Sequence, residues 1–510
     1  MSTVAEKLAI WSQRLRYEDL PQPVVHEVKR RVIDSIGCAL GAYASEPARI
    51  VRELAAEYTS TRAGATVIGS GQRTMPDLAT FANGTMVRYL DYNDTYLSKE
   101  PAHPSDNIPA ALAVAEARQR SGRDLILAIV IGYEIQCRLC DAASLRAHGW
   151  DHVNYGNFSV ACLAARLLGL SVEQTVHALG IAGVAHNAMR QTRAGTLSEW
   201  KACAFANAAR NGVFAALLAA KGMSGPAPIF EGVFGFWKLV SGKFALDPFG
   251  GETLPPPSPP WQGGEPLPPS PLWEGGASLP PSPLWEGGAS HPPSPPWQGG
   301  EKEGVQPFKI LDTYIKFFPV EYHAQSGVDA ALKLREKLGR LDLSGIEDIA
   351  EINVQTFDAC VDIIAGEPEK WNPTTRETAD HSLPYCIAVA LRDGEVTLAS
   401  FDEQRLRDPQ LHALMQKIKV HRNAECNAQY PEGIPNDIEI ILKSGERLRE
   451  KVVFPRGHCR NPMSDEEVEA KFRQLATMVL PPAQVEKALR RLWQLEEMDD
   501  AGEVLSLVRI

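Results

Sequence analysis

Apolar residues recur every three or four positions through most of the first half of the chain. This spacing is typical of a helix with one buried face. A clear example lies near the N-terminus, with apolar side chains at Val25, Val28, Val32, Ile36 and Leu40. Few segments before residue 250 alternate with the period of a strand. Residues 1–250 are therefore predicted to form an all-helical domain.

After about residue 305 the pattern changes. Segments 345–357, 394–401 and 437–455 are rich in β-branched residues and alternate in part, as strands do. Ser444-Gly445 is a hairpin turn signal inside the third segment. Helical patterns lie between these segments, so residues 305–455 are predicted to form a smaller α+β domain.

The last residues return to helical spacing. Ser464 and Glu467 form a capping box before an apolar run, and Ser171 and Gln174 form another in the first domain. We expect residues 456–510 to form helices that pack back on the helical domain.

A repeat interrupts the chain between the two domains. Segments such as PSPPWQGGEPLP and PSPLWEGGASLP recur with a period of twelve, which places tryptophans at Trp261, Trp273, Trp285 and Trp297. Proline removes backbone donors and glycine loosens the chain. Residues 251–304 are predicted to be a disordered, low-complexity insertion; a polyproline tract that binds a partner is the alternative. The fold class is thus mainly α, with a large helical domain, a smaller α+β domain and this insertion.

Composition narrows the functional classes. The 510 residues are 44% apolar and 23% charged, and the net charge is −11. No basic block offsets that charge, so we expect no nucleic-acid or anionic-membrane partner, although a locally positive pocket can still bind a small anion. The N-terminus carries charges throughout, and the longest apolar stretch, residues 125–133, is too short to span a bilayer. We expect a cytoplasmic protein.

The cysteines do not form a metal-binding pattern. Cys137 and Cys140 make up the one CxxC pair among nine cysteines, and no second pair completes a zinc set. The chain also has no G-x-G-x-x-G after a strand, no P-loop and no G-x-S-x-G. We therefore expect neither a metal nor a cofactor.

Candidate chemistry starts with the loop RYLDYNDTYLSKEPAHPSDN, residues 88–107. It holds Asp91, Thr95 and His103 between helical runs, and two prolines disfavour helix around the histidine. Residues 105–107 are as well explained by capping of the next helix. An ordinary surface or core histidine is the alternative for His103.

Further polar clusters lie at other predicted helix and strand borders. Each alone is typical of a solvated loop. Their acid, base and cationic side chains include His152, Arg193, Lys201, Lys316, His323, Arg376 and Tyr385.

Taken together, five segments resemble the MmgE/PrpD family in order along the chain. They are RYLDYNDTYLSKEPAHPSDNIPAALAVAE, GWDHVNYGNFSVACLAARLLGLS, SEWKACAFANAARNGVFAALLAAKGMSGP, IKFFPVEYHAQSGVDAAL and NPTTRETADHSLPYCIAVAL. The resemblance implies a large helical domain, a smaller α+β domain, a homodimer, and an active site at the domain junction without an iron–sulfur cluster. The Pro/Trp/Gly repeat departs from the family pattern.

The resemblance also implies the residues of the site. Matching positions suggest that Asp91, Thr95, His103, Lys201, Lys316 and Tyr385 line the pocket, with weaker matches at His152 and His323. We expect His103, Asp91, Lys201 and Tyr385 to take part in catalysis. The expected substrate-binding residues are Thr95, His152, Lys316, His323, Arg193 and Arg376, the two arginines because guanidinium groups suit carboxylates.

The activity implied by the resemblance is 2-methylcitrate dehydration without a cofactor. NPTTRETADHSLPY and the long spacer between Thr95 and His103 favour that branch. Removing a proton beside a carboxylate needs a base, cations and an acid. His103 is expected to transfer the proton, with Asp91 orienting it or acting as the base. The alternatives are cis-aconitate decarboxylation, iminodisuccinate epimerisation, or an inactive scaffold that acts through the repeat.

Overall fold

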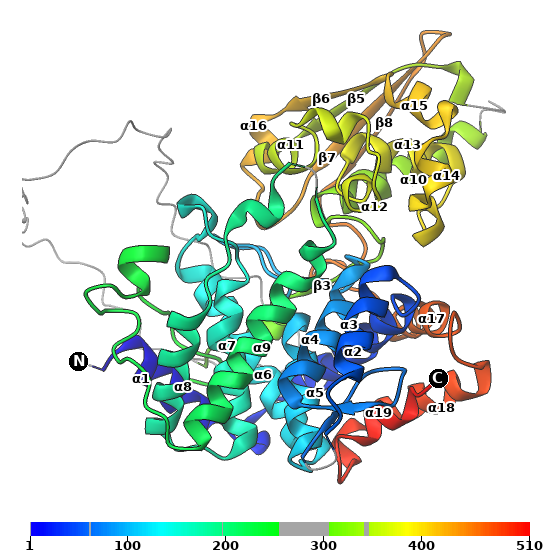
Figure 1. Cartoon of the computed structure of the whole chain (residues 1–510). Coiled ribbons are helices and arrows are strands. Elements are labelled where there is room, and N and C mark those ends of the chain that lie inside the picture. The colour runs from blue at the N-terminus through cyan, green and yellow to red at the C-terminus, as the bar shows by residue number, and fades with distance from the viewer. Residues whose placement is uncertain (1, 61–62, 196, 254–304, 341–345) are drawn as a thin grey trace, which may run out of the picture.

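The computed structural model describes residues 2–60, 63–195, 197–253, 305–340 and 346–510. The prediction for residues 251–304 lies outside the described residues, apart from residues 251–253. Two bodies are visible in Figure 1, a helical one and one built around a sheet. The helices of the first body before the insertion are α1 (Val4–Arg14), α2 (Gln22–Gly41), α3 (Glu46–Ala56), α4 (Pro76–Tyr89), α5 (Ile108–Ala117), α6 (Gly122–Ala142), α7 (Asn154–Leu168), α8 (Val172–Ala185) and α9 (Trp200–Ala220).

Small residues allow the central helices of this body to approach closely. Helix α9 packs against α4, α7 and α8. A Cβ added at Gly84 in α4 would lie 2.9 Å from the Cβ of Ala206 in α9, so the contact needs glycine at that position. Among the described helices, α9 is the one long and apolar enough to cross a membrane, and 67% of its apolar window is buried within the protein.

The C-terminal helices share the core of the first body. They are α17 (Asp465–Ala476), α18 (Pro482–Leu492) and α19 (Glu503–Leu507). Helices α17 and α18 contact α2, and Figure 1 shows α17 beside α2. The predicted capping boxes at Ser464 and Ser171 are both confirmed: each hydroxyl accepts a hydrogen bond from the backbone of the residue three positions on.

The second body is a four-stranded mixed sheet covered by helices. Strand order is β6-β5-β7-β8; β5 is parallel to β6 and antiparallel to β7, and β7 pairs with β8 through the predicted hairpin. Helix α10 packs on β7 and β8, and α13 packs on α10. The elements are α10 (Gln325–Arg340), β5 (Ile349–Thr356), α11 (Asp358–Ile364), α12 (Arg376–Ala379), α13 (Leu383–Asp393), α14 (Glu403–Leu406), α15 (Pro409–Met415), β6 (Ile418–Arg422), α16 (Ala424–Asn427), β7 (Asn436–Leu442) and β8 (Arg447–Val452).

The predicted strand at 394–401 is wrong. Gly394 ends α13 in a left-handed conformation, with a φ of 77°. Thr397 then caps a 3-10 turn over Leu398–Phe401, where its backbone N–H donates to Ser400. Local side-chain hydrogen bonds of this kind satisfy the backbone without a sheet partner.

Two short antiparallel pairs complete the fold, and one of them positions the site. Strand β1 (Ala65–Thr66) pairs with β2 (Arg73–Thr74), and β3 (Asp94–Thr95) pairs with β4 (Tyr314–Ile315). The second pair joins the loop after α4 to the chain that enters the sheet domain, at the junction seen in Figure 1. It brings residues 91–95 beside Lys316, which follows β4 directly.

The two ends of the insertion are held together. The buried Glu134 carboxylate accepts hydrogen bonds from the backbone of Gly250 and Lys309, each 2.7 Å long. Thr253 forms a β-bridge with Val305. The chain therefore leaves and re-enters the described fold at one place.

Candidate active site

A cavity of about 320 Å³ lies where the two bodies meet. Eight of the ten predicted site residues line it: Asp91, Thr95, His103, His152, Arg193, Lys201, Lys316 and His323. Polar segments more than 200 residues apart in sequence therefore meet in one cavity. It is also lined by residues that the sequence reasoning did not select, among them Arg88, Arg146, Arg190, Lys370 and His381.

Asp91 lies at the centre of the charged groups. It follows α4 with a φ of 50°, a left-handed conformation that aspartate tolerates better than most residues. Its Oδ1 accepts hydrogen bonds from Arg88 and, at 2.6 Å, from Lys316 Nζ; Lys201 Nζ lies 3.3 Å from Oδ2. Burial alone would raise the pKa of Asp91, but Arg88, Lys201 and Lys316 outweigh it and hold the pKa well below its usual range. Asp91 is therefore a carboxylate, and a weakly basic one.

His103 is oriented by a backbone carbonyl. Its Nδ1 lies 2.7 Å from the oxygen of Asp94, and its Nε2 lies 3.0 Å from Nη2 of Arg88. A carbonyl oxygen only accepts and a guanidinium only donates, so Nδ1 carries the proton and Nε2 carries a lone pair. Burial, and next Arg88, lower the pKa of His103 well below 6.5. Contrary to our expectation, Asp91 therefore does not contact His103 directly; Arg88 lies between them and contacts both.

His152 is a second neutral histidine beside the first. The centroids of the two rings are 5.9 Å apart. Burial lowers the pKa of His152 to about 3, although Asp151 opposes this shift, and its Nδ1 has no hydrogen-bond partner among the described residues. Arg193 does not face the cavity as a free charge, because its Nε lies 3.0 Å from Asp151 Oδ2.

His323 belongs to the sheet domain and pairs with an acid. Its Nδ1 lies 2.8 Å from Glu321 Oε1, and its Nε2 lies 3.4 Å from the Tyr430 hydroxyl. Burial would raise the pKa of Glu321, but His323 outweighs it and the pKa falls to about 2. Glu321 is therefore ionised and orients the His323 ring.

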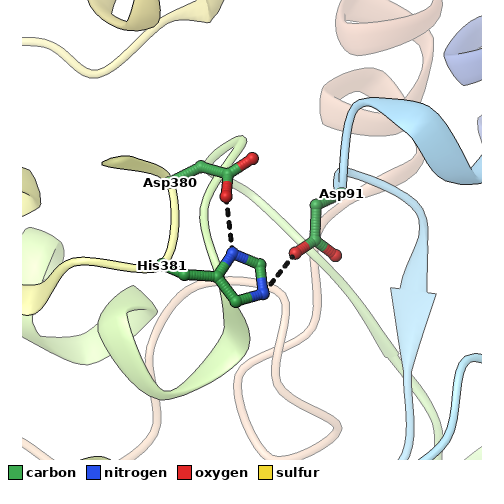
Figure 2. A group of neighbouring side chains, drawn as sticks. All are labelled: Asp91, Asp380 and His381. Carbon is green, nitrogen blue, oxygen red and sulfur yellow. Dashed lines mark hydrogen bonds and ion pairs between the residues drawn. The ribbon is translucent and has the colours of Figure 1, made fainter. Parts of the chain in front are cut away.

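His381 lies between two carboxylates, as Figure 2 shows. Its Nδ1 contacts Asp380 Oδ1, and its Nε2 lies 3.2 Å from Asp91 Oδ2. Ligand atoms of the three residues lie within 4.8 Å of one another, as in a metal site. However, Arg88, Lys201 and Lys316 already neutralise Asp91 and would repel a divalent ion, so these residues do not favour a metal.

Tyr385 and Arg376 do not line the cavity. The Tyr385 hydroxyl donates a 2.7 Å hydrogen bond to the Ser400 carbonyl within the core of the sheet domain. Its position on α13 directs the ring toward Phe401. The Arg376 guanidinium lies over the rings of Tyr89 and Phe401. Neither side chain is therefore placed to act on a substrate in the cavity.

Three cations of the lining have no carboxylate partner. Within the described parts of the chain, Arg146, Arg190 and Lys370 form no ion pair, whereas Arg88, Lys201 and Lys316 share Asp91. Burial and the nearby Arg146 lower the pKa of Arg190, and burial lowers that of Lys370, so both would gain from an anion. Arg146, Arg190 and Lys370 lie in three segments that are far apart in sequence, and no sequence pattern indicates that these segments meet in one cavity.

The fold and the cavity define a class: a two-domain protein with a polar site at the domain junction, lined by both cationic and acidic side chains. Patterns for the MmgE/PrpD N-terminal and C-terminal domains match residues 6–248 and 318–495. The chain therefore belongs to the MmgE/PrpD family, as the sequence motifs predicted.

Named relatives cover most of the chain. It is 28% identical to the 2-methylcitrate dehydratase of Escherichia coli (strain K12) over 453 residues, 84% of this chain and 81% of the relative. It is 29% identical to the mitochondrial 2-methylcitrate dehydratase of Yarrowia lipolytica, over 90% of this chain and 81% of that protein. It is also 26% identical to human cis-aconitate decarboxylase, over 100% and 95% of the two chains. The family's enzymes therefore include dehydratases and a decarboxylase.

Proposed function

We propose that this protein is a hydro-lyase that dehydrates 2-methylcitrate to 2-methyl-cis-aconitate without a cofactor. The observation that carries the proposal is the set of three unpaired cations, Arg146, Arg190 and Lys370, in one cavity with the Asp91 cluster. A tricarboxylate supplies three negative charges for them. A cavity of about 320 Å³ is at the small end of ligand pockets, which suits a compact polyanion.

His103 is the base in this proposal. Its Nε2 is unprotonated and accepts a hydrogen bond from Arg88. A guanidinium binds carboxylates strongly, so an arriving substrate carboxylate can take Arg88 and free the lone pair of Nε2. The weak basicity of His103 changes when substrate binds. One negative charge at about 4 Å is worth about 4 kcal/mol at an effective dielectric constant of about 20, which corresponds to about three pKa units. The substrate's own charge thus makes His103 a stronger base at the moment it is needed.

The cations then stabilise the charge that develops on the substrate carboxylate as the C–H bond breaks. Lys201 and Lys316 lie beside Asp91 and hold the cluster in place from both bodies of the protein. Because groups from both bodies are required, we expect activity to depend on the domain junction.

A substrate panel tests the proposal. Purified protein is incubated separately with 2-methylcitrate, citrate and cis-aconitate, and products are followed by proton NMR. We expect a new C=C–carboxylate product from 2-methylcitrate, with turnover reduced by about 10² or more in His103→Gln. Release of CO₂ from cis-aconitate would instead support the decarboxylase activity that the human relative's name describes.

Two variants separate binding from chemistry. Arg190→Met should raise KM far more than it lowers kcat, because it removes a charge that holds the substrate. His421→Gln, an exposed histidine on β6, is the matched control. If wild-type protein leaves all three compounds unchanged, the proposed function is wrong.

A second copy of the chain is the partner that we propose. Helix α9 is rich in apolar residues, and an apolar helix face is normally covered by another element. Large apolar side chains on α8, α9, the segment between them and the segment after α9 are nevertheless exposed: Val184, Met189, Trp200, Phe214, Met223, Val233, Phe234 and Leu239. Light scattering should give a dimer for wild type and a monomer for Phe214→Glu; a monomeric wild type would contradict this. The expected cytoplasmic location stays a prediction.

A further inference from the structure

The proposed dehydration also needs an acid that protonates the departing hydroxyl, and no residue has yet been assigned to that step. His381 lines the cavity and has no role in the chemistry described so far. It lies between α12 and α13 of the sheet domain, whereas its neighbour Asp91 follows α4 of the helical body. The contact between them therefore forms only when the two bodies are together.

The two ring nitrogens of His381 each lie beside a carboxylate oxygen. Nδ1 is 2.5 Å from Asp380 Oδ1, and Nε2 is 3.2 Å from Asp91 Oδ2. Carboxylate oxygens only accept hydrogen bonds. The Nδ1–H therefore donates to Asp380, and a second proton on Nε2 would lie between the ring and Asp91, so the two carboxylates favour the protonated ring.

Lys201 does not change this assignment. Its Nζ lies 3.1 Å from Nδ1 of His381, so it competes with Asp380 for that nitrogen. The contact with Asp380 is the shorter one, and Lys201 Nζ also lies 3.3 Å from Asp91 and 3.7 Å from Asp380. The ammonium also donates to Asp91, so Nδ1 need not accept a hydrogen bond from it.

We propose that His381 is a further catalytic residue, the acid that gives its Nε2 proton to the departing hydroxyl of the substrate. The inference rests on the proposed dehydration. In that step His103 takes the proton from the C–H bond, and the electron pair of that bond forms the C=C bond. The C–O bond breaks, and its oxygen leaves with the proton from His381 as water. His103 then loses one proton to solvent and His381 regains one, which restores both groups.

The surroundings of His381 suit an acid of this kind. Asp380, Asp91, Lys201 and Glu321 are the charged groups that face it. Burial, and next Lys201, lower the pKa of His381, so a proton held there is given up readily. Asp380 and Asp91 oppose that shift without reversing it, and the carboxylates of a bound substrate would act in the same direction to protonate the ring.

A change of leaving group tests the proposal directly. Fluoride departs without needing a proton, so an analogue of 2-methylcitrate with fluorine in place of the hydroxyl bypasses the acid. We expect His381→Gln to lower kcat by about 10² or more with 2-methylcitrate, the usual size of general acid catalysis, and by less than about tenfold with the fluoro analogue. His421→Gln should leave both rates unchanged.

Three outcomes decide the matter. Equal losses with both compounds would overturn the proposal, because a purely structural role affects both leaving groups. Unchanged turnover of 2-methylcitrate by His381→Gln would overturn it as well. Wild-type protein inactive on both compounds would instead refute the proposed function. If His381→Gln does not fold, Asp380→Asn serves in its place and should show the same selective loss, at smaller size, because it leaves His381 present but misoriented.

Discussion

Replacing His152 with asparagine should change how stability depends on pH. The His152 side chain is 11% exposed, and burial lowers its pKa from 6.5 to about 3. Below pH 6.5 the unfolded chain binds a proton on this histidine, whereas the folded protein does not bind one until about pH 3. The folded state therefore loses stability as the pH falls below 6.5.

The size of the effect follows from the same two values. The penalty grows by about 1.4 kcal/mol for each pH unit below 6.5 and is almost zero one unit above it. Between about pH 7.5 and about pH 5.5, wild type should thus lose about 1.4 kcal/mol that His152→Asn does not lose. When the pH is lowered from about 7.5 to about 5.5, the free energy of unfolding of His152→Asn minus that of wild type should therefore rise by about 1.4 kcal/mol.

Urea titrations followed by circular dichroism at the two pH values provide the assay. His421→Asn controls for the removal of a histidine as such, since His421 is exposed and does not line the cavity. A relative stability of His152→Asn that is the same at both pH values would refute the reasoning. It would mean that His152 is solvated or paired in the folded protein.

Three further predictions concern other parts of the molecule. Tyr385→Phe should cost about 1 kcal/mol of unfolding free energy, because it removes the hydrogen bond to the Ser400 carbonyl. It should leave kcat within a few-fold of wild type, because Tyr385 does not line the cavity. A large loss of kcat would show that Tyr385 takes part in the reaction. Lys316→Met should cost about 1.5–3 kcal/mol, since it removes one charged hydrogen bond from buried Asp91 but leaves Arg88 and Lys201, and an unchanged urea midpoint would contradict this. Replacing residues 254–304 with two glycines should keep the melting temperature within about 4 °C and leave the turnover unchanged, because a β-bridge already holds Thr253 next to Val305. Loss of folding in this variant would contradict the prediction.

The helical body was predictable because its period repeats over many turns. The spacing of Val25 to Leu40 gave α2, and the capping boxes at Ser171 and Ser464 gave two helix starts. The strand predicted at 394–401 failed for a local reason. β-branched residues there are satisfied by a turn, and composition alone does not distinguish a turn from an edge strand.

The site was predictable as a set of residues but not as a set of contacts. The two-residue pair β3 and β4 joins Asp91 to Lys316, and a pair that short leaves no periodic signal. Arg88 was missed although it stands three positions before Asp91 at a helix end, a spacing that allows an ion pair. His381 lay in a loop noted for its polar residues, but only the folded chain shows that it faces Asp91.

The central claim is that the unpaired cations at the domain junction hold a tricarboxylate. Propane-1,2,3-tricarboxylate has no hydroxyl to lose, so calorimetric titration with it measures binding without turnover. We expect it to bind wild type at least about 10² times more tightly than acetate, because two further carboxylates each gain a charged partner worth about 1.5–3 kcal/mol. Arg190→Met should lose most of one such increment. Equal affinities for the tricarboxylate and acetate, or an affinity unchanged in Arg190→Met, would contradict the account.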